Sequence, residues 1–155
     1  MMSNTTTAMN NLARTPMVEP VQEDATYRTA KRALDEFGRG AKSGDFSGFL
    51  DMVTDDFTFY MPVGQPTENT GREAITKFLD IFKQVGASLT YQPPFRTSRQ
   101  GSTVVFEYED SGTMLKRPYH NVLAISMDVR GDKIAAYREY WGEIDPQLIA
   151  DLTKS

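Results

Sequence analysis

The spacing of apolar residues changes once along this chain of 155 residues, close to Gly86. Before Gly86, apolar side chains recur every three or four residues, a pattern that is typical of amphipathic helices. After it, apolar and polar residues alternate between short turn-forming segments, which is typical of hairpins. Helices followed by consecutive hairpins predict an α+β domain, with the helices on one face of an antiparallel sheet.

The segment before Gly86 is expected to hold three helices and one strand. The helices are predicted over about residues 27–41, 46–53 and 70–85, and the strand over residues 57–61. Thr70 and Glu73 have the spacing of a capping box at the start of the third helix. Residues 1–22 are polar and show no periodicity, so they are predicted to form a flexible arm, and residues 23–155 a single domain.

Five strand-like segments follow, and a short helix is expected to end the chain. The strands are predicted over residues 89–92, 95–99, 103–109, 119–129 and 133–141. Residues 110–112 and residues 130–132 are predicted to be turns. Pro146 is expected at the first position of the last helix.

Composition excludes several classes of function. The net charge is −4 and the pI is near 5.0, so we expect no surface for nucleic acid or for an anionic membrane. With no cysteine and one histidine, the chain offers no disulfide, no thiolate and no Cys- or His-rich metal site; we expect no metal and no cofactor. No apolar run approaches the roughly 18 residues of a membrane span, and the N-terminus does not resemble a signal peptide, so a soluble cytoplasmic protein is expected.

The last predicted strand carries an acidic residue between two large aromatic ones. Residues two apart in a strand share a face, so Tyr137, Glu139 and Trp141 are expected to lie on one side of the sheet. An aromatic environment withholds water from a carboxyl group and raises its pKa toward the range that is useful for proton transfer. The alternative is a solvated glutamate on an open sheet edge.

Short segments along the chain occur in an order that resembles a known superfamily. Residues 55–56 are two aspartates, residues 61–66 read Met-Pro-Val-Gly-Gln-Pro, residues 71–75 read Gly-Arg-Glu-Ala-Ile, and residues 139–144 read Glu-Tyr-Trp-Gly-Glu-Ile. Over about residues 27–145 the chain resembles the nuclear transport factor 2-like superfamily, and within it the ketosteroid isomerase and SnoaL-like branch. The resemblance implies a cone-shaped, curved antiparallel sheet with three N-terminal helices packed on it. Such a fold does not by itself supply a function.

The resemblance to ketosteroid isomerase implies a carboxylate base and two oxyanion donors. At the corresponding positions this chain has Met61, Phe37 and Ala124, which are all apolar. Steroid isomerisation by that mechanism is therefore not expected. Together with Trp141, these residues are expected to line a cone suited to a small apolar or polycyclic ligand. The alternative is that they fill the cone as ordinary core.

Residues 138–140, Arg-Glu-Tyr, resemble limonene epoxide hydrolase and the phenazine-biosynthesis proteins of the same fold. This resemblance implies that Glu139 acts as an acid or base inside the cone. The hydrolase also needs an Arg-x-Asp pair on the adjacent strand, and the nearest segment here, residues 107–110, contains no arginine. Epoxide hydrolysis by that triad is therefore not expected.

Three further polar residues are candidates for the pocket. Counting by twos from Ala124 puts His120 on the face that lines the cone, where it could approach Glu139 and titrate near neutral pH. Tyr60 and Tyr108 could donate hydrogen bonds into the pocket. For each of the three, the alternative is an ordinary surface or core residue.

We therefore expect a small-molecule enzyme that works by general acid/base chemistry, with Glu139 as the acid/base and His120 or Tyr60 as its polar complement. Isomerisation, cyclisation, dehydration and hydrolysis all stay open. The alternative is a noncatalytic module that binds a ligand or dimerises. A homodimer is also expected, because four apolar residues are predicted on the sheet face opposite the cone: Tyr119, Leu123, Ile134 and Tyr140.

Overall fold

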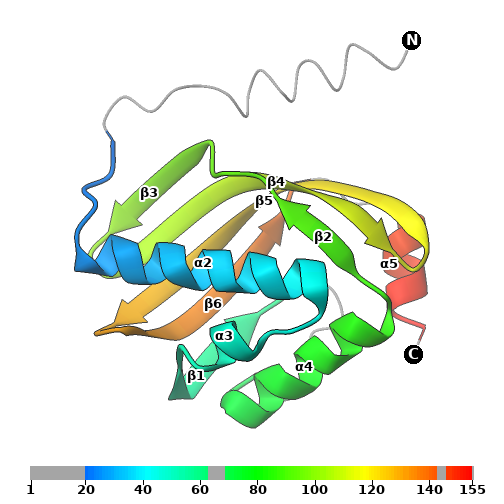
Figure 1. Cartoon of the computed structure of the whole chain (residues 1–155), viewed down its shortest axis with the longest axis horizontal. Coiled ribbons are helices and arrows are strands. Elements are labelled where there is room, and N and C mark those ends of the chain that lie inside the picture. Colours follow the sequence, from blue (N-terminus) through cyan, green and yellow to red (C-terminus); the bar gives the residue numbers. More distant parts are fainter. Residues whose placement is uncertain (1–19, 63–68, 143–145, 155) are drawn as a thin grey trace.

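The computed structural model describes residues 20–62, 69–142 and 146–154, so the predicted arm over residues 1–22 lies almost entirely outside the described residues. The described helices are α2 (Ala25–Ser43), α3 (Ser47–Leu50), α4 (Arg72–Gln84) and α5 (Pro146–Leu152). The described strands are β1 (Val53–Tyr60), β2 (Ser88–Tyr91), β3 (Arg96–Gln100), β4 (Thr103–Met114), β5 (Arg117–Arg130) and β6 (Lys133–Trp141). Figure 1 shows the strands as one curved sheet with α2 lying across it. None of the described helices is long and apolar enough to cross a membrane.

The sheet confirms the predicted α+β class and corrects its strand directions. Its strand order is β1-β6-β5-β4-β2, and β3 pairs with the first half of β4. Every pair is antiparallel except β1 and β6, which run parallel. The sheet is therefore mixed, because β1 comes from the helical part of the chain and lies beside the last strand. The predicted second helix is a single turn, α3, of four residues.

A local side-chain signal explains how α2 begins, whereas α4 begins without one. The Asp24 side chain caps α2 by accepting a hydrogen bond from the Tyr27 N–H at 3.1 Å, and Gly44 ends this helix with a φ of 86°. The predicted capping box of α4 is wrong, because that helix has no side-chain cap. Thr70 instead forms a β-bridge with Thr58, which keeps its backbone extended.

Strand β4 is longer than predicted and contains the residues of the predicted turn at 110–112. It continues to Met114, pairing with β5 along its whole length and with β2 across residues 110–113. The chain turns instead at Leu115 and Lys116, which both have positive φ. Two partner strands outweigh the local turn preference of Asp-Ser-Gly, since strand formation depends strongly on tertiary context.

A β-bulge at Ala135 decides which residues of β5 and β6 point into the domain. Val129 pairs with Ile134 and Asp128 pairs with Ala136, so Ala135 has no partner on β5. Before the bulge, the even-numbered residues of β6 point into the domain; after it, the odd-numbered residues do. On β5, the odd-numbered residues lie opposite them and also point inward. Strict alternation along β6 would instead put the even-numbered residues of β5 inside.

Three buried aromatic rings join the helices to the inner face of the sheet. The Phe37 ring of α2 lies 5.0 Å, between centroids, from the Phe49 ring of α3 and 5.0 Å from the Tyr137 ring of β6. Phe49 and Tyr137 complete the triangle at 5.9 Å. Such packing fixes α2 and α3 above β6, where the side chain of Tyr137 reaches the interior.

Gly112 permits the close approach of β2 to β4. A Cβ atom at this position would clash with the backbone carbonyl oxygen of Ser88, which cannot move without disturbing the pairing of the two strands. We expect Gly112→Ala to lower the free energy of unfolding by about 2–3 kcal/mol in urea denaturation. Thr113→Ala, which truncates an exposed neighbour, should change it by less than about 1 kcal/mol. Equal effects of the two substitutions would contradict this account of the packing.

Candidate functional site

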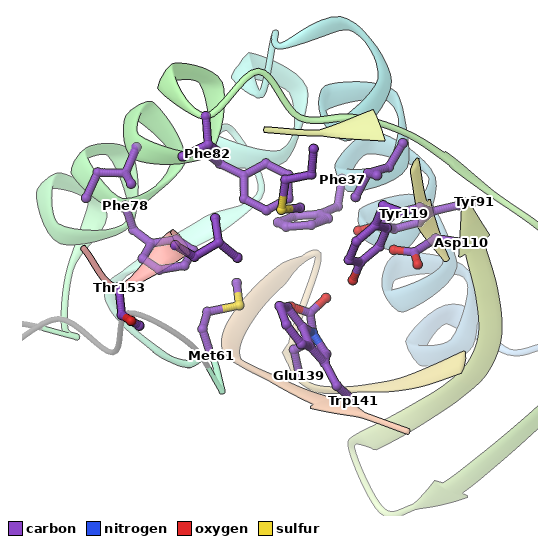
Figure 2. A pocket seen from close by; sticks show the side chains of 15 residues that line it. Phe37, Met61, Phe78, Phe82, Tyr91, Asp110, Tyr119, Glu139, Trp141 and Thr153 are labelled. Carbon is purple, nitrogen blue, oxygen red and sulfur yellow. The ribbon is translucent and has the colours of Figure 1, made fainter. Parts of the chain in front are cut away.

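The helices and the inner face of the sheet enclose a cavity of about 330 Å³ (Figure 2). Its walls come from α2, the end of β1, α4, the sheet and the C-terminal segment: Phe37, Met61, Phe78, Ile81, Phe82, Val85, Leu89, Tyr91, Asp110, Met114, Tyr119, Glu139, Trp141, Leu152 and Thr153. A cavity of this size can hold a small organic molecule. The cone is therefore open rather than filled as core.

Glu139 lies in the cavity wall, and only 7% of the residue is exposed. The Tyr137 hydroxyl donates a hydrogen bond to its Oε1 at 3.2 Å. Burial raises the pKa of the Glu139 carboxyl from 4.5 to about 7, while the Trp141 indole and the Tyr137 hydroxyl act in the opposite direction. The indole N–H, although beside this carboxyl, makes no hydrogen bond of ordinary geometry within the described part of the chain. Glu139 can therefore exchange its proton near neutral pH.

A second carboxyl group, that of Asp110 on β4, lies in the same cavity. Asp110 is 2% exposed, and its Oδ1 has no hydrogen-bond partner among the described residues. Burial, and to a smaller extent the charge of Glu139, raises the pKa of Asp110 from 3.8 to about 8. Because the two acids interact, they titrate as a pair around neutral pH rather than as two independent groups.

Tyrosine side chains surround the two acids. The Tyr119 hydroxyl oxygen accepts a hydrogen bond from Asn121 Nδ2 at 3.0 Å, which leaves its own proton able to donate. Tyr91 packs on Tyr108, with ring centroids 4.7 Å apart. Burial raises the pKa of all these tyrosines and of Tyr137, so their hydroxyl groups stay neutral.

No lysine, arginine or histidine belongs to the described lining of this cavity. The arginine beside Glu139 in the sequence, Arg138, points to the outer face of the sheet, where it pairs with Asp128 at 2.5 Å. Across the described ranges, no group of three or more acidic or histidine side chains could hold a metal ion. The cavity is thus apolar and aromatic, with two carboxyl groups in its wall.

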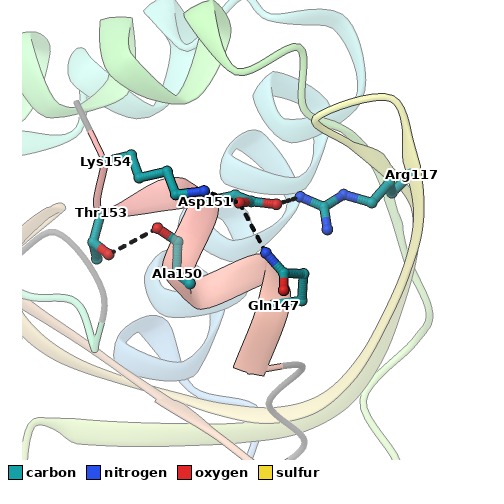
Figure 3. A network of polar contacts seen from close by, with 6 residues as sticks. All are labelled: Arg117, Gln147, Ala150, Asp151, Thr153 and Lys154. Carbon is teal, nitrogen blue, oxygen red and sulfur yellow. Dashed lines mark hydrogen bonds and ion pairs between the residues drawn. The ribbon is translucent and has the colours of Figure 1, made fainter.

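Helix α5 forms one wall of the cavity through Leu152. An ion pair between Asp151 and Arg117, at the start of β5, fastens this helix to the sheet (Figure 3). Asp151 Oδ1 also accepts hydrogen bonds from Gln147 and Lys154, both at 3.1 Å. This wall is therefore held by polar contacts on the surface as well as by apolar packing.

A model of a known protein family matches most of this chain. The model of the SnoaL-like domain matches residues 30–137, which is more than half of the chain; Asp110 lies within this match and Glu139 just beyond its end. The chain belongs to the SnoaL-like family. Among proteins with curated functions, none matches it.

Solved structures show that this SnoaL-like domain has the nuclear transport factor 2-like fold. An NTF2-like protein from Anabaena variabilis is 36% identical, with a TM-score of 0.74, over 83% of this chain and 97% of that chain. An NTF2-like protein from Burkholderia xenovorans is 22% identical, with a TM-score of 0.62, over 84% of this chain and 96% of that chain. A protein with a ketosteroid isomerase-like fold from Catenulispora acidiphila is 15% identical, with a TM-score of 0.61, over 78% of this chain and 91% of that chain.

The SnoaL-like domain brings most of the predicted site residues together. Four of them line the cavity: Phe37, Met61, Glu139 and Trp141. Tyr137 and Tyr108 lie behind the wall, both fully buried, and each contacts a lining residue. Tyr137 holds the carboxyl group of Glu139, and Tyr108 supports the Tyr91 ring.

Two predicted site residues on β5 lie outside the cavity. His120 and Ala124 are even-numbered residues of this strand and point to the outer face, so their predicted inward orientation is wrong. The reason is the bulge at Ala135, which strict alternation does not include. The His120 side chain is 45% exposed and faces Glu109 at 3.4 Å, so it does not approach Glu139.

The face predicted for dimerisation also needs correction. Three of the four predicted residues are buried inside the domain, because the bulge at Ala135 reverses the faces of the strands: Tyr119, Leu123 and Ile134. Tyr140 is exposed on the outer face, and its ring packs on that of Tyr60 with 5.9 Å between centroids. Tyr60 is therefore outside the cavity too. Most of the apolar residues on which the predicted homodimer depended are therefore buried inside the domain. The homodimer itself stays a prediction.

Asp110 and Tyr119 are among the lining residues that the sequence patterns do not place in the cavity. Asp110 falls in the segment predicted as a turn, and Tyr119 on the face predicted to be outside. The sequence does contain a signal for Asp110, because the apolar residues Val104, Phe106 and Tyr108 stand two apart and the next position of that series is 110. Helix α4 adds Phe78 and Phe82, whose apolar stripe looks like ordinary core in the sequence.

The two buried carboxyls predict an unusual dependence of stability on pH. Between their unfolded values, 3.8 and 4.5, and their folded values, about 8 and about 7, the folded protein binds more protons than the unfolded chain. Their contribution to stability is therefore full at low pH and is lost as the pH rises through this window. As the pH rises from about 5 to about 8, the free energy of unfolding of Asp110→Asn should increase by about 1–4 kcal/mol relative to that of the parent protein. Urea unfolding at each pH measures this difference. Asp132→Asn, an exposed control, should follow the parent; a parallel pH dependence for Asp110→Asn would contradict the raised pKa.

Removal of the ion pair between Asp151 and Arg117 is expected to let helix α5 open more often. We expect Asp151→Asn to speed amide hydrogen exchange across residues 146–154 by about two- to fivefold, because a partly exposed pair contributes about 0.5–1 kcal/mol. Lys154→Gln removes a more exposed partner of the same carboxylate and should have a smaller effect. Unchanged exchange in Asp151→Asn would show that apolar packing alone holds the helix.

Proposed function

We propose that this SnoaL-like domain catalyses proton transfer on a small, largely apolar metabolite bound in the cavity, with Glu139 as the general acid/base. The observation that carries the proposal is a buried carboxyl group in the cavity wall, oriented by the Tyr137 hydroxyl, whose pKa burial raises to about 7. An acid/base group works best when its pKa lies near the operating pH. The apolar and aromatic lining suits an apolar substrate and limits the access of water to the carboxyl group.

Two neighbours support this role for Glu139. The Tyr137 hydroxyl fixes the orientation of the carboxyl group through its hydrogen bond of 3.2 Å. Asp110 is the second acid of the pair, so one proton can be held while another is transferred. Isomerisation, cyclisation and dehydration each require removal of a proton from one atom and delivery to another, which such a pair can perform.

Structures of the same fold have been solved with small molecules. The Catenulispora acidiphila protein was solved in complex with trimethylamine. TerC, which is 19% identical to this chain with a TM-score of 0.65, was co-crystallised with polyporic acid. Both support a small-molecule ligand for the cavity.

A noncatalytic ligand-binding module is the second candidate function. Where the resemblance to ketosteroid isomerase implies catalytic groups, the cavity has Phe37 and Met61. Ala124 points outward, and its two neighbours that point inward, Leu123 and Ile125, are apolar as well. These replacements favour binding without turnover, whereas the buried acid pair favours catalysis.

Exchange of carbon-bound protons in heavy water tests the proposal and does not require the substrate to be identified first. Apolar ketones and β-dicarbonyl compounds are incubated with the protein, and loss of the α-proton signal is followed by proton NMR. We expect the unmodified protein to accelerate exchange for at least one class. Glu139→Gln should slow that exchange by about 10²–10⁴-fold and keep ligand binding, because only the proton-transfer role is lost.

Glu109→Gln is the matched control, since it makes the same change on the outer face of β4, where Glu109 faces His120. It should leave the exchange rate unchanged. Full exchange by Glu139→Gln would refute the assignment of the acid/base. If the unmodified protein binds these compounds but does not accelerate exchange of their protons, the noncatalytic binding module is the function that remains.

A further inference from the structure

The ionisable groups in the described lining of the cavity are acids and tyrosines, without a basic side chain. Asp110 and Glu139 lie in its described lining, and no lysine, arginine or histidine does. Asp110 Oδ1 is buried and has no hydrogen-bond partner among the described residues. A buried acceptor without a donor is costly, so a ligand that supplies a donor gains from meeting it. An anionic ligand would instead meet two acids and no compensating cation.

Aromatic rings line the same end of the cavity. Figure 2 shows Tyr91, Tyr119 and Trp141 close to the two carboxyl groups, and Phe37 lines the same cavity. The Tyr119 and Trp141 rings meet edge to face, with centroids 6.3 Å apart and an interplanar angle of 72°. Organic cations are attracted to the faces of such rings, most strongly where water is excluded.

The other end of the cavity is mostly apolar, with Thr153 as its polar lining residue. Phe78 and Phe82 of α4 lie there, apart from the two acids in Figure 2. Val85 and Met114 add aliphatic surface to the lining. A volume of about 330 Å³ exceeds what a bare ammonium group fills, so an apolar body is expected to occupy this end.

We propose that the cavity binds an amine with an apolar body, whose ammonium group is anchored by Asp110, beside Glu139 and among the surrounding aromatic rings. This amine would be the substrate class of the proposed enzyme, so the proposal rests on that function. A protonated secondary or tertiary amine fits better than a quaternary one, because Asp110 Oδ1 requires an N–H donor. Asp110 then anchors the ammonium group, and Glu139 remains as the group that transfers a proton.

The electrostatics of the cavity agree with a cationic ligand. Burial raises the pKa of both carboxyl groups, and a nearby cation lowers them again. Binding near neutral pH should therefore release protons. The tyrosines that face the acids, Tyr91, Tyr119 and Tyr137, have raised pKa values and stay neutral, so the released protons come from the two carboxyl groups.

Three probes of similar shape and different charge test the proposal on the full chain. Benzyldimethylamine is protonated near neutral pH, isobutylbenzene is its neutral carbon isostere, and phenylacetate is an anion. Quenching of Trp141 fluorescence reports binding, because Trp141 is the single tryptophan and lines the cavity. We expect the amine to bind at least about tenfold more tightly than isobutylbenzene, and phenylacetate not to bind. Calorimetry in two buffers of different ionisation enthalpy should show proton release for the amine.

Matched variants assign the preference to the cavity. Asp110→Asn should remove most of the preference for the amine, whereas Asp132→Asn, the same change in the exposed β5–β6 turn, should keep it. The comparison of probes on the unmodified protein is sufficient if Asp110→Asn does not fold. Equal binding of the amine and isobutylbenzene, or no binding of the amine at millimolar concentration, overturns the proposal.

Failure of the ammonium proposal and failure of the proposed function give different results. Glu139-dependent proton exchange on neutral ketones, without any preference for the amine, would uphold the enzyme and overturn the cationic ligand. Tight binding of the amine without proton exchange on any compound would uphold the cationic ligand in a noncatalytic module.

Discussion

The unpaired residue Ala135 on β6 determines the chemistry of the inner face of the sheet. A strictly alternating strand cannot point both Ile134 and Glu139 to the same side. The bulge turns both inward, and the odd-numbered residues of β5 face them, with Ile125 opposite Glu139. Without this irregularity, the acid of the last strand and the apolar residues of β5 could not share one cavity wall.

Features that depend on one segment alone are predicted well from the sequence. The long helices, most of the strands and the inward orientation of Glu139 follow from periodicity within a single element. The bulge, the parallel pairing of β1 with β6 and the continuation of β4 through Asp110 depend on partner strands, so local patterns do not indicate them. For this reason the sequence identifies one acid of the cavity, misses the other, and turns His120 to the wrong side.

The two buried acids of the cavity lower the stability of the folded protein. Keeping Asp110 and Glu139 away from water raises the pKa of both carboxyl groups, which means that their ionisation opposes folding above neutral pH. The aromatic cluster of Phe37, Phe49 and Tyr137, which includes the tyrosine bound to Glu139, stabilises the fold and offsets part of this cost. A buried acid pair in an open cavity, rather than in a filled core, is what supports the proposed proton transfer.

Carbon-13 NMR titration of the side-chain carboxyl groups in the full chain tests the central claim most directly. Asp110→Asn and Glu139→Gln assign the two resonances by their disappearance. We predict that both carboxyl resonances titrate around neutral pH, with apparent pKa values of about 7 and about 8 that belong to the interacting pair. Titration of both groups near their ordinary values of 4.5 and 3.8 would contradict the buried acid pair, and with it the proposed catalytic role of the cavity.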